Sequence, residues 1–179
     1  MHEFSQRDLA YVTRLDEVLW GGLLLALTIG IHGVGMLLTL RATNAIKDRT
    51  TELRSRYPAV PLGILILAAW MIILTNLIEV MAWAGFFVWK GAQPSIFSAS
   101  YNALLNYTTL AAGYLPLRWR LLEGMLGMGG LITFAWSTSI LFTLAQEFME
   151  QALPTAAQRR ERQQPRLAAA AHDWSGDSG

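Results

Sequence analysis

Residues 91–118 read GAQPSIFSASYNALLNYTTLAAGYLPLR, and this stretch decides which fold the sequence predicts. It is longer than an ordinary helix–helix connection of about 2–8 residues, and it is too apolar for a solvated loop. Pro94, Ser95 and Ser98 form a helix-start signal, and apolar residues then recur at helical spacing. The stretch therefore predicts a short helix of about 12 residues. An irregular segment should follow it, in which Gly113 permits an unusual backbone conformation.

Long apolar runs flank this stretch. Windows of about 19 residues place spanning helices near 19–40, 61–89 and 119–147. The only ionisable residue from 19 to 40 is His32, and from 58 to 89 it is Glu79. Since about 20 apolar residues cross a bilayer, the sequence predicts an all-α membrane protein with three transmembrane helices.

Composition narrows the class of protein further. The 179 residues are 53% hydrophobic and 15% charged, whereas soluble domains carry about 25% charged residues. The formal net charge of +1 argues against a nucleic-acid partner, and without cysteine there is no thiol nucleophile or thiolate ligand. An intramembrane enzyme needs convergent reactive groups, but the spans offer only His32 and Glu79. We therefore expect no catalytic residues, no metal site and no bound cofactor.

Charge also predicts the orientation in the membrane. Residues 1–17 hold four acids and two arginines, whereas a secretory signal begins with a basic segment, so the first span should be retained. Nine Lys and Arg residues lie in 41–57 and the C-terminal tail, and five lie on the opposite side. This bias predicts a multi-pass protein of the inner cell membrane, with segment 1–18 outside. The basic tail, 148–179, should be cytoplasmic and partly disordered.

Two interpretations of residues 94–115 are open. The first is a re-entrant helix and loop between the second and third spans. Such a loop survives at membrane depth only when it is buried in protein or lines a water-filled cavity. The second is an amphipathic helix that lies flat on the outer membrane surface.

The sequence of the loop resembles a known filter. Residues 107–114, YTTLAAGY, resemble the Thr-Thr-Leu-Gly-Tyr-Gly-Asp filter of potassium-channel-like pore-loop proteins. Residues 119–124 and 134–139 are similar to inner-helix sequences of small bacterial members, which also have one extra helix before a two-helix pore module. The resemblance spans about residues 19–146. It implies a homotetramer whose central pore, able to hold a monovalent cation, is lined by Thr108, Thr109, Leu110, Ala111, Ala112, Gly113 and Tyr114.

The departures from the filter shape the expected function. Ala111 and Ala112 replace the first glycine and the tyrosine, and Tyr114 replaces the acid. Forcing an L-residue into the left-handed region costs about 1–2 kcal/mol, so four copies of Ala111 would store about 4–8 kcal/mol. We expect a weakly selective cation pathway rather than a potassium carbonyl stack. The alternative is a non-conducting structural or accessory subunit that packs beside other membrane proteins.

Three polar residues within the first two spans, His32, Asn76 and Glu79, are candidates for a functional role. A carboxylate at membrane depth costs at least about 2.5 kcal/mol, so Glu79 should support the loop through bonds to its backbone or to Ser or Tyr hydroxyls. A proton relay through Glu79 would need His32 and Asn76. We expect His32 to hydrogen-bond across a close helix contact made by its neighbouring glycines. The hydroxyls of Thr108 and Thr109 either line the pore or cap their own helix.

Further candidate functional residues lie near the start of the third span and within it. Glu123 suits a helix N-terminus, where it could pair with Arg118 or Arg120. The alternative is that it attracts cations at the outer mouth. Gly127, Gly129 and Gly130 act as a hinge, as room for the loop, or as a close helix contact. Membrane lipids are expected partners, and the tail arginines should contact anionic headgroups.

Overall fold

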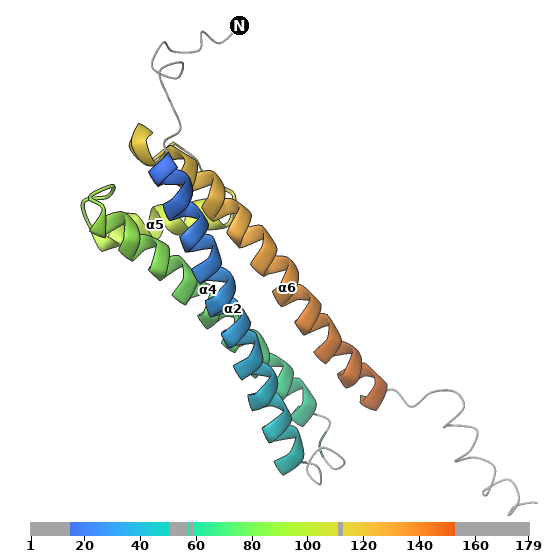
Figure 1. Ribbon diagram of the computed structural model, residues 1–179. Coiled ribbons are helices and arrows are strands. Elements are labelled where there is room, and N and C mark those ends of the chain that lie inside the picture. Colours follow the sequence, from blue (N-terminus) through green and yellow to red (C-terminus); the bar gives the residue numbers. More distant parts are fainter. Residues whose placement is uncertain (1–14, 51–56, 58, 111–112, 153–179) are drawn as a thin grey trace, which may run out of the picture.

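The computed structural model describes residues 15–50, 57, 59–110 and 113–152. Within those ranges the chain is helical and has no strand. The elements are α2 (Leu15–Arg49), α4 (Ala59–Trp89), α5 (Ile96–Tyr107), the 3-10 turn η1 (Leu117–Trp119) and α6 (Arg120–Ala152). The three long helices form an elongated bundle, and the short α5 packs at one end of it (Figure 1). All three are long and apolar enough to cross a membrane, as the sequence predicts.

The predicted helix ends differ in accuracy. Helix α4 begins two residues before the predicted 61 and ends at Trp89 as expected, and α6 continues five residues past 147. The prediction for the first span was wrong at its end, because α2 continues through Arg49. Arg41 and Lys47 therefore lie on a helix rather than in a loop. Basic residues in a last helical turn complement the helix dipole. Arg54 and Arg56, segment 1–14 and segment 153–179 lie outside the described residues.

The short helix of about 12 residues predicted after Pro94 is confirmed as α5. Ser95 is the N-cap of α5, and its hydroxyl accepts the backbone N–H of Ser98 at 3.2 Å. After the helix ends, Thr109 has a φ of +60° and Gly113 a φ of +92°. The left-handed backbone at Thr109 is costly for a residue other than glycine, about 1–2 kcal/mol. The segment after α5 thus has a left-handed backbone at Thr109 and at Gly113.

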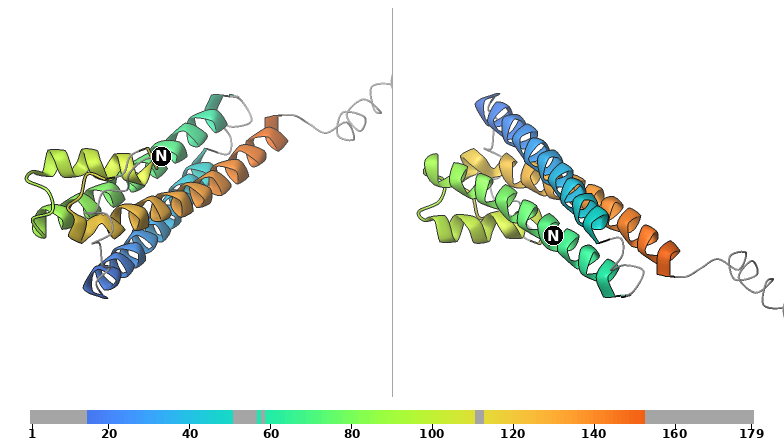
Figure 2. Two further views of the ribbon diagram at one scale, coloured as in Figure 1. Left: turned by 90° about the horizontal axis from the view of Figure 1, so that it is seen from above. Right: turned by 90° about the horizontal axis from the view of Figure 1, so that it is seen from below.

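Helix α5 runs back along α4 and touches α6. Ser100 contacts Met81, and Tyr107 at the end of α5 contacts Glu79, earlier in α4. Both views in Figure 2 show α5 alongside the C-terminal half of α4. A side chain at Gly130 on α6 would collide with the backbone carbonyl of Tyr107. The missing side chain therefore lets α5 lie against α6.

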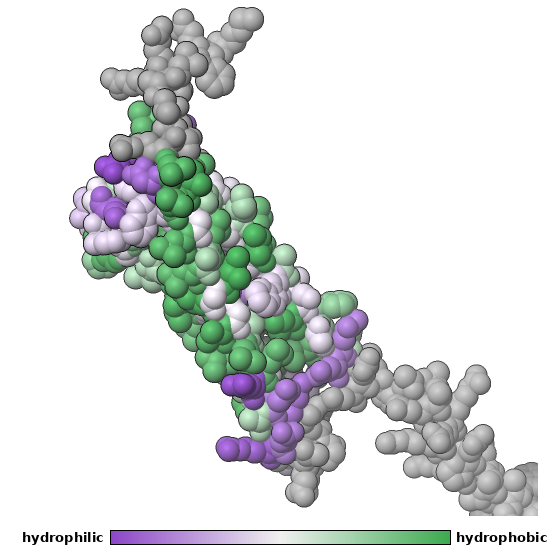
Figure 3. All heavy atoms as spheres, in the orientation of Figure 1, coloured by the Kyte–Doolittle hydropathy of each residue, from purple (hydrophilic) through white to green (hydrophobic). Residues whose placement is uncertain are grey.

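The two ends of the bundle differ in chemistry. At the α5 end, rings of Trp20, Phe86 and Trp119 pack together, with Phe86 5.5 Å from Trp20 and 5.9 Å from Trp119. The ammonium of Lys90 lies 4.1 Å from the Trp20 ring centroid. At the other end, an ion pair joins Lys47 on α2 to Glu147 on α6. On the face shown in Figure 3, apolar residues cover the middle and hydrophilic residues gather towards the ends.

Candidate functional site

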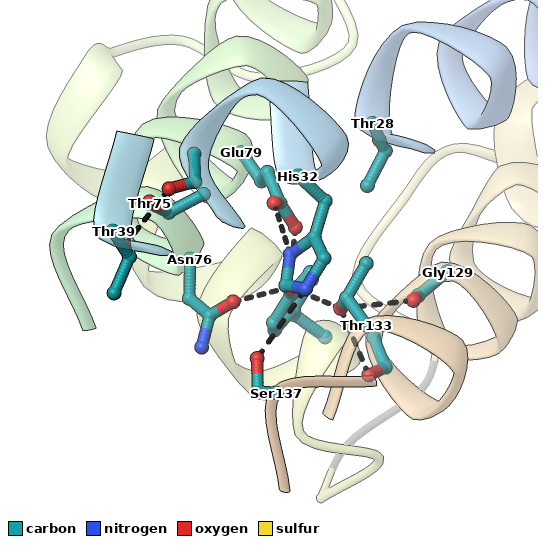
Figure 4. A network of polar contacts seen from close by, with 12 residues as sticks. Thr28, His32, Thr39, Thr75, Asn76, Glu79, Gly129, Thr133 and Ser137 are labelled. Atoms are coloured by element: carbon teal, nitrogen blue, oxygen red, sulfur yellow. Dashed lines mark hydrogen bonds and ion pairs between the residues drawn. The ribbon is translucent and has the colours of Figure 1, made fainter. Parts of the chain in front are cut away.

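Four buried side chains, one from each helix, form a continuous polar network (Figure 4). His32 Nδ1 on α2 lies 2.8 Å from Glu79 Oε1 on α4. The Tyr107 hydroxyl on α5 donates to Glu79 Oε2 at 2.5 Å and lies 2.5 Å from Thr133 Oγ1 on α6. No more than 1% of any of these residues is exposed. The network therefore ties α5 to all three long helices.

Further groups complete the hydrogen bonding of the network. Ser137 Oγ lies 3.4 Å from His32 Nε2, and Asn76 Oδ1 lies 3.3 Å from the Tyr107 hydroxyl. No buried side-chain nitrogen or oxygen of the described residues lacks a hydrogen-bond partner. A buried carboxylate is tolerated when its oxygens are paired and hydrogen-bonded. Both oxygens of Glu79 have partners. One partner is a tyrosine hydroxyl, which was among the partners expected from the sequence.

The network lies far from the end of the bundle where α5 begins. Glu79 precedes Trp89, the end of α4, by ten residues, which corresponds to about 15 Å along a helix. Thr133 follows Arg120, the start of α6, by 13 residues, or about 20 Å. The chain therefore descends along the bundle through α5 and must return to the start of α6 within a short segment.

The returning segment is held by Glu123. Its carboxylate accepts the backbone N–H groups of Gly113, Tyr114 and Leu115 at 2.6, 2.8 and 2.6 Å. Successive N–H groups that converge in this way form an anion-binding concavity, which the chain fills with its own carboxylate. As expected of an acid at a helix start, Glu123 lies in the first turn of α6. The guanidinium of Arg118, one of the two arginines considered as its partner, lies 3.5 Å from Asp16. Glu123 is only 4% exposed and is turned towards the loop.

Two residues that the sequence did not single out hold the loop and the start of α6 after it. The Gln93 side chain, before α5, donates to the Tyr114 carbonyl at 3.3 Å. Glu17 on α2 is 1% exposed and accepts the N–H of Leu121, in the first turn of α6, at 3.0 Å. An acid that accepts a free N–H at a helix start is a common cap. Its position in the sequence could have suggested a cap, but not that the capped helix is α6.

The predicted filter residues are only partly enclosed by one chain. The Thr108 hydroxyl donates to the Leu104 carbonyl at 2.9 Å, so it caps its own helix. Thr109 and Gly113 are exposed, and Leu110 and Tyr114 are 76% and 57% exposed. Ala111 and Ala112 lie outside the described residues.

Three of the four glycines of α6 face two different helices. An added Cβ at Gly127 would lie 3.2 Å from the Asn106 carbonyl, and one at Gly130 would overlap the Tyr107 carbonyl. At Gly129 it would lie 3.1 Å from Leu25 on α2. Gly127 and Gly130 thus give α5 room, and Gly129 allows a close contact with α2. Arg120 is the first residue of α6.

Ser137, His32 and Glu79 stand in the hydroxyl–imidazole–carboxylate order of a hydrolase triad. Ser137 is 4% exposed, and its 3.4 Å distance to His32 is longer than the about 2.6–3.2 Å of an active pair. The second oxygen of Glu79 is bonded to Tyr107. A hydroxyl buried in this way offers no surface to a substrate, so we assign these residues to the network. The described residues contain no group of three His, Asp or Glu that could hold a metal.

Comparison of the chain with protein-family models, with curated proteins and with solved structures found no match. The resemblance to the potassium-channel-like family therefore stays a prediction that rests on residues 107–139. The site itself is defined by its contacts: a buried network at the end of α5 and a carboxylate that holds the loop after it.

Proposed function

We propose that the protein forms a weakly selective cation pathway in which four copies surround a common axis and residues 108–114 line it. The position of α5 carries the proposal. Its last residue reaches Glu79 and Thr133, and the chain then returns to Glu123 near the start of α6. In a membrane crossed by the three long helices, such a segment would be a re-entrant loop.

The exposure of the loop supports an assembly. Irregular backbone is tolerated at membrane depth only where protein or a water-filled cavity surrounds it. In one chain, Thr109, Leu110, Gly113 and Tyr114 are exposed, so a lone copy would turn irregular backbone towards lipid. Several copies around an axis would give each loop neighbours on its sides and water at the centre.

The direction of the peptide groups supports a cation as the permeant species. In a trans peptide the N–H and C=O groups point in opposite directions. Because the N–H of Tyr114 points at Glu123, the carbonyl of Gly113 points away from it. The C-terminal end of α5 adds a partial negative charge of about half a unit. Four such ends would attract cations, and a loop without the family's glycines would discriminate weakly between them.

One observation favours the second candidate, a non-conducting structural or accessory subunit. Leu110 is 76% exposed and occupies a filter position. Four leucines that meet on an axis would form an apolar constriction, and such constrictions can close a pore by excluding water.

Conductance separates the two candidates. Purified protein would be compared in planar bilayers with the triple variant A111G/A112Y/Y114D, which restores Thr-Leu-Gly-Tyr-Gly-Asp at 109–114. We expect the wild type to pass small monovalent cations with little discrimination and the variant to prefer potassium. The control is Leu74→Ala, a change on the exposed surface of α4, which should leave conductance unchanged.

Other results would change the conclusion. A silent wild type with a potassium-conducting variant would establish the non-conducting candidate on a channel scaffold. A stable monomer or dimer in mild detergent, together with silence of both proteins, would overturn the central pore.

A further inference from the structure

We propose that α2 and α4 bind one anionic phospholipid, with an acyl chain in the groove between the two helices and the phosphate on Arg41. This site is separate from the α5 loop, and the proposal depends on the membrane-spanning helices but not on conduction.

The groove is apolar and open to the outside of the bundle. It has a volume of about 590 Å³ and is lined on α2 by residues that include Leu27, Gly30, Val34 and Leu38, and on α4 by Thr75 and Ile78. Thr75 contributes the one hydroxyl, which already donates to the Met71 carbonyl at 3.0 Å. A hydrocarbon chain is the ligand that such a surface fits, because it leaves no polar group unpaired.

Missing side chains on α2 create the hollow. A Cβ at Gly30 would meet nothing within 4 Å, so this position opens into the groove. At Gly35 the opposite holds, because an added Cβ would collide with Thr75. Gly35 therefore brings α4 close as the floor, and Gly30 leaves the space above it free. Larger side chains at Leu27 and Leu38 border the space along the helix.

A positive charge lies at one end of this groove. Arg41 follows Leu38 by three residues, a spacing that places two side chains next to each other on one helix face. Arg41 is exposed, and no acid among the described residues forms an ion pair with it. Nearby Lys47 differs, because it pairs with Glu147.

The depth of Arg41 matches a lipid headgroup. It is the first charged residue after the apolar run 19–40, which spans about 33 Å as a helix. A hydrocarbon core is about 30 Å thick, so Arg41 lies at its boundary. The guanidinium binds phosphate oxygens bidentately. An apolar groove parallel to the helices that ends at such a group fits a phospholipid whose chain lies along the membrane normal.

Native mass spectrometry of the full-length protein in detergent tests the proposal. Phosphatidylglycerol and phosphatidylcholine with identical chains are titrated separately. We expect the wild type to retain one phosphatidylglycerol in preference to phosphatidylcholine. Arg41→Gln should reduce that preference about fivefold, the factor expected from one basic residue near anionic lipid. The matched control, Arg49→Gln, removes a charge from the same helix and should preserve the preference.

A second pair of variants tests the groove itself. Gly30→Leu fills the hollow and should abolish retention of the tightly held lipid. Gly63→Leu is the matched control, because a Cβ at Gly63 also meets nothing within 4 Å and Gly63 does not line this groove. Thermal melts of both proteins would show that each is folded.

The outcomes are distinct. Equal retention of phosphatidylglycerol by Gly30→Leu and Gly63→Leu would overturn the site, as would equal retention of the two lipids by the wild type. A change in subunit number in Gly30→Leu alone would also overturn it, because a second copy would then occupy the groove. Conductance appears in none of these measurements, so a silent protein would leave the lipid result intact.

Discussion

The two ends of the bundle are held together in different ways. In the half of the bundle that holds α5, three buried carboxylates act as acceptors: Glu79 for a tyrosine hydroxyl, Glu123 for three loop amides and Glu17 for an amide of α6. At the opposite end, the ion pair of Lys47 and Glu147 is partly exposed, with 18% and 46% of the side chains accessible. Regular helices satisfy their own backbone, whereas an irregular segment does not. These three carboxylates therefore lie close to the segment where the chain leaves helical structure.

The largest effect should come from breaking the network at its centre. Glu79→Leu removes the acceptor shared by His32 and Tyr107 and leaves both polar groups buried. We expect the free energy of unfolding to fall by about 3–5 kcal/mol, as for other buried pairs that lose one partner. Chemical denaturation of the protein in detergent measures this value. A loss below about 1 kcal/mol, typical of an exposed pair, would remove the distinction between the two ends.

The second effect concerns the carboxylate behind the loop. Glu123→Leu keeps an apolar side chain of similar size but removes the acceptor for the amides of residues 113–115. Hydrogen bonds to charged groups contribute about 1.5–3 kcal/mol each, so those amides should open more readily. Hydrogen–deuterium exchange should become faster in the peptide that contains Gly113 and Leu115.

Exchange elsewhere serves as the internal control for that variant. Peptides from the middle of α4 should exchange as slowly as in the wild type. If the loop peptide keeps its slow exchange in Glu123→Leu, the carboxylate is not what orders the loop.

The third prediction uses the close approach of α5 to α6. Gly130→Ala places a Cβ against the Tyr107 carbonyl and should destabilise the protein by about 1–3 kcal/mol, the usual cost of overpacking. The matched control is Gly124→Ala, because a Cβ there meets nothing within 4 Å and alanine favours a helix. Thermal unfolding should show a lower Tm for the first variant and an equal or higher Tm for the second. Equal melting of the two would contradict the observed contact.

The smallest effect is expected at the end opposite α5. Glu147→Gln removes the partner of Lys47, and exposed ion pairs contribute about 0–1 kcal/mol. Its free energy of unfolding should stay within about 1 kcal/mol of the wild-type value in the same denaturation series as Glu79→Leu. A loss as large as that of Glu79→Leu would show that both ends contribute comparably to the free energy of unfolding.

Local signals explain why α5 could be predicted. Ser95 and Ser98 lie at the spacing of a side-chain cap, and the structure has that hydrogen bond. The end of α2 could not be found in the same way, because hydropathy falls at Arg41 while the backbone hydrogen bonds of a helix continue. An apolar window detects the membrane core and not the length of the helix that crosses it.

The contacts of the candidate site were likewise predictable only in part. A lone carboxylate at membrane depth requires buried partners, so a hydroxyl partner for Glu79 was predictable, but the identity of Tyr107 depends on how α5 folds back. Glu123 was predictable as an acid at a helix start, with Arg118 or Arg120 as candidate partners. Its observed partners are the backbone amides of residues 113–115, a segment that begins with Gly113 at a positive φ. Such contacts depend on the path of the chain, which residue types do not reveal.

The contact of Glu17 with Leu121 has a consequence for biogenesis. Helix α2 is synthesised first, yet two of its buried polar side chains contact helices made later: His32 contacts α4 and Glu17 contacts α6. A nascent α2 alone in lipid would lack the contact of His32 with Glu79 and that of Glu17 with Leu121. Pairing with α4 supplies the first contact, and the second waits until the last helix has been translated. The N-terminal helix thus makes its last polar contact with the C-terminal one. A chain truncated before α6 would lack the amide that Glu17 accepts.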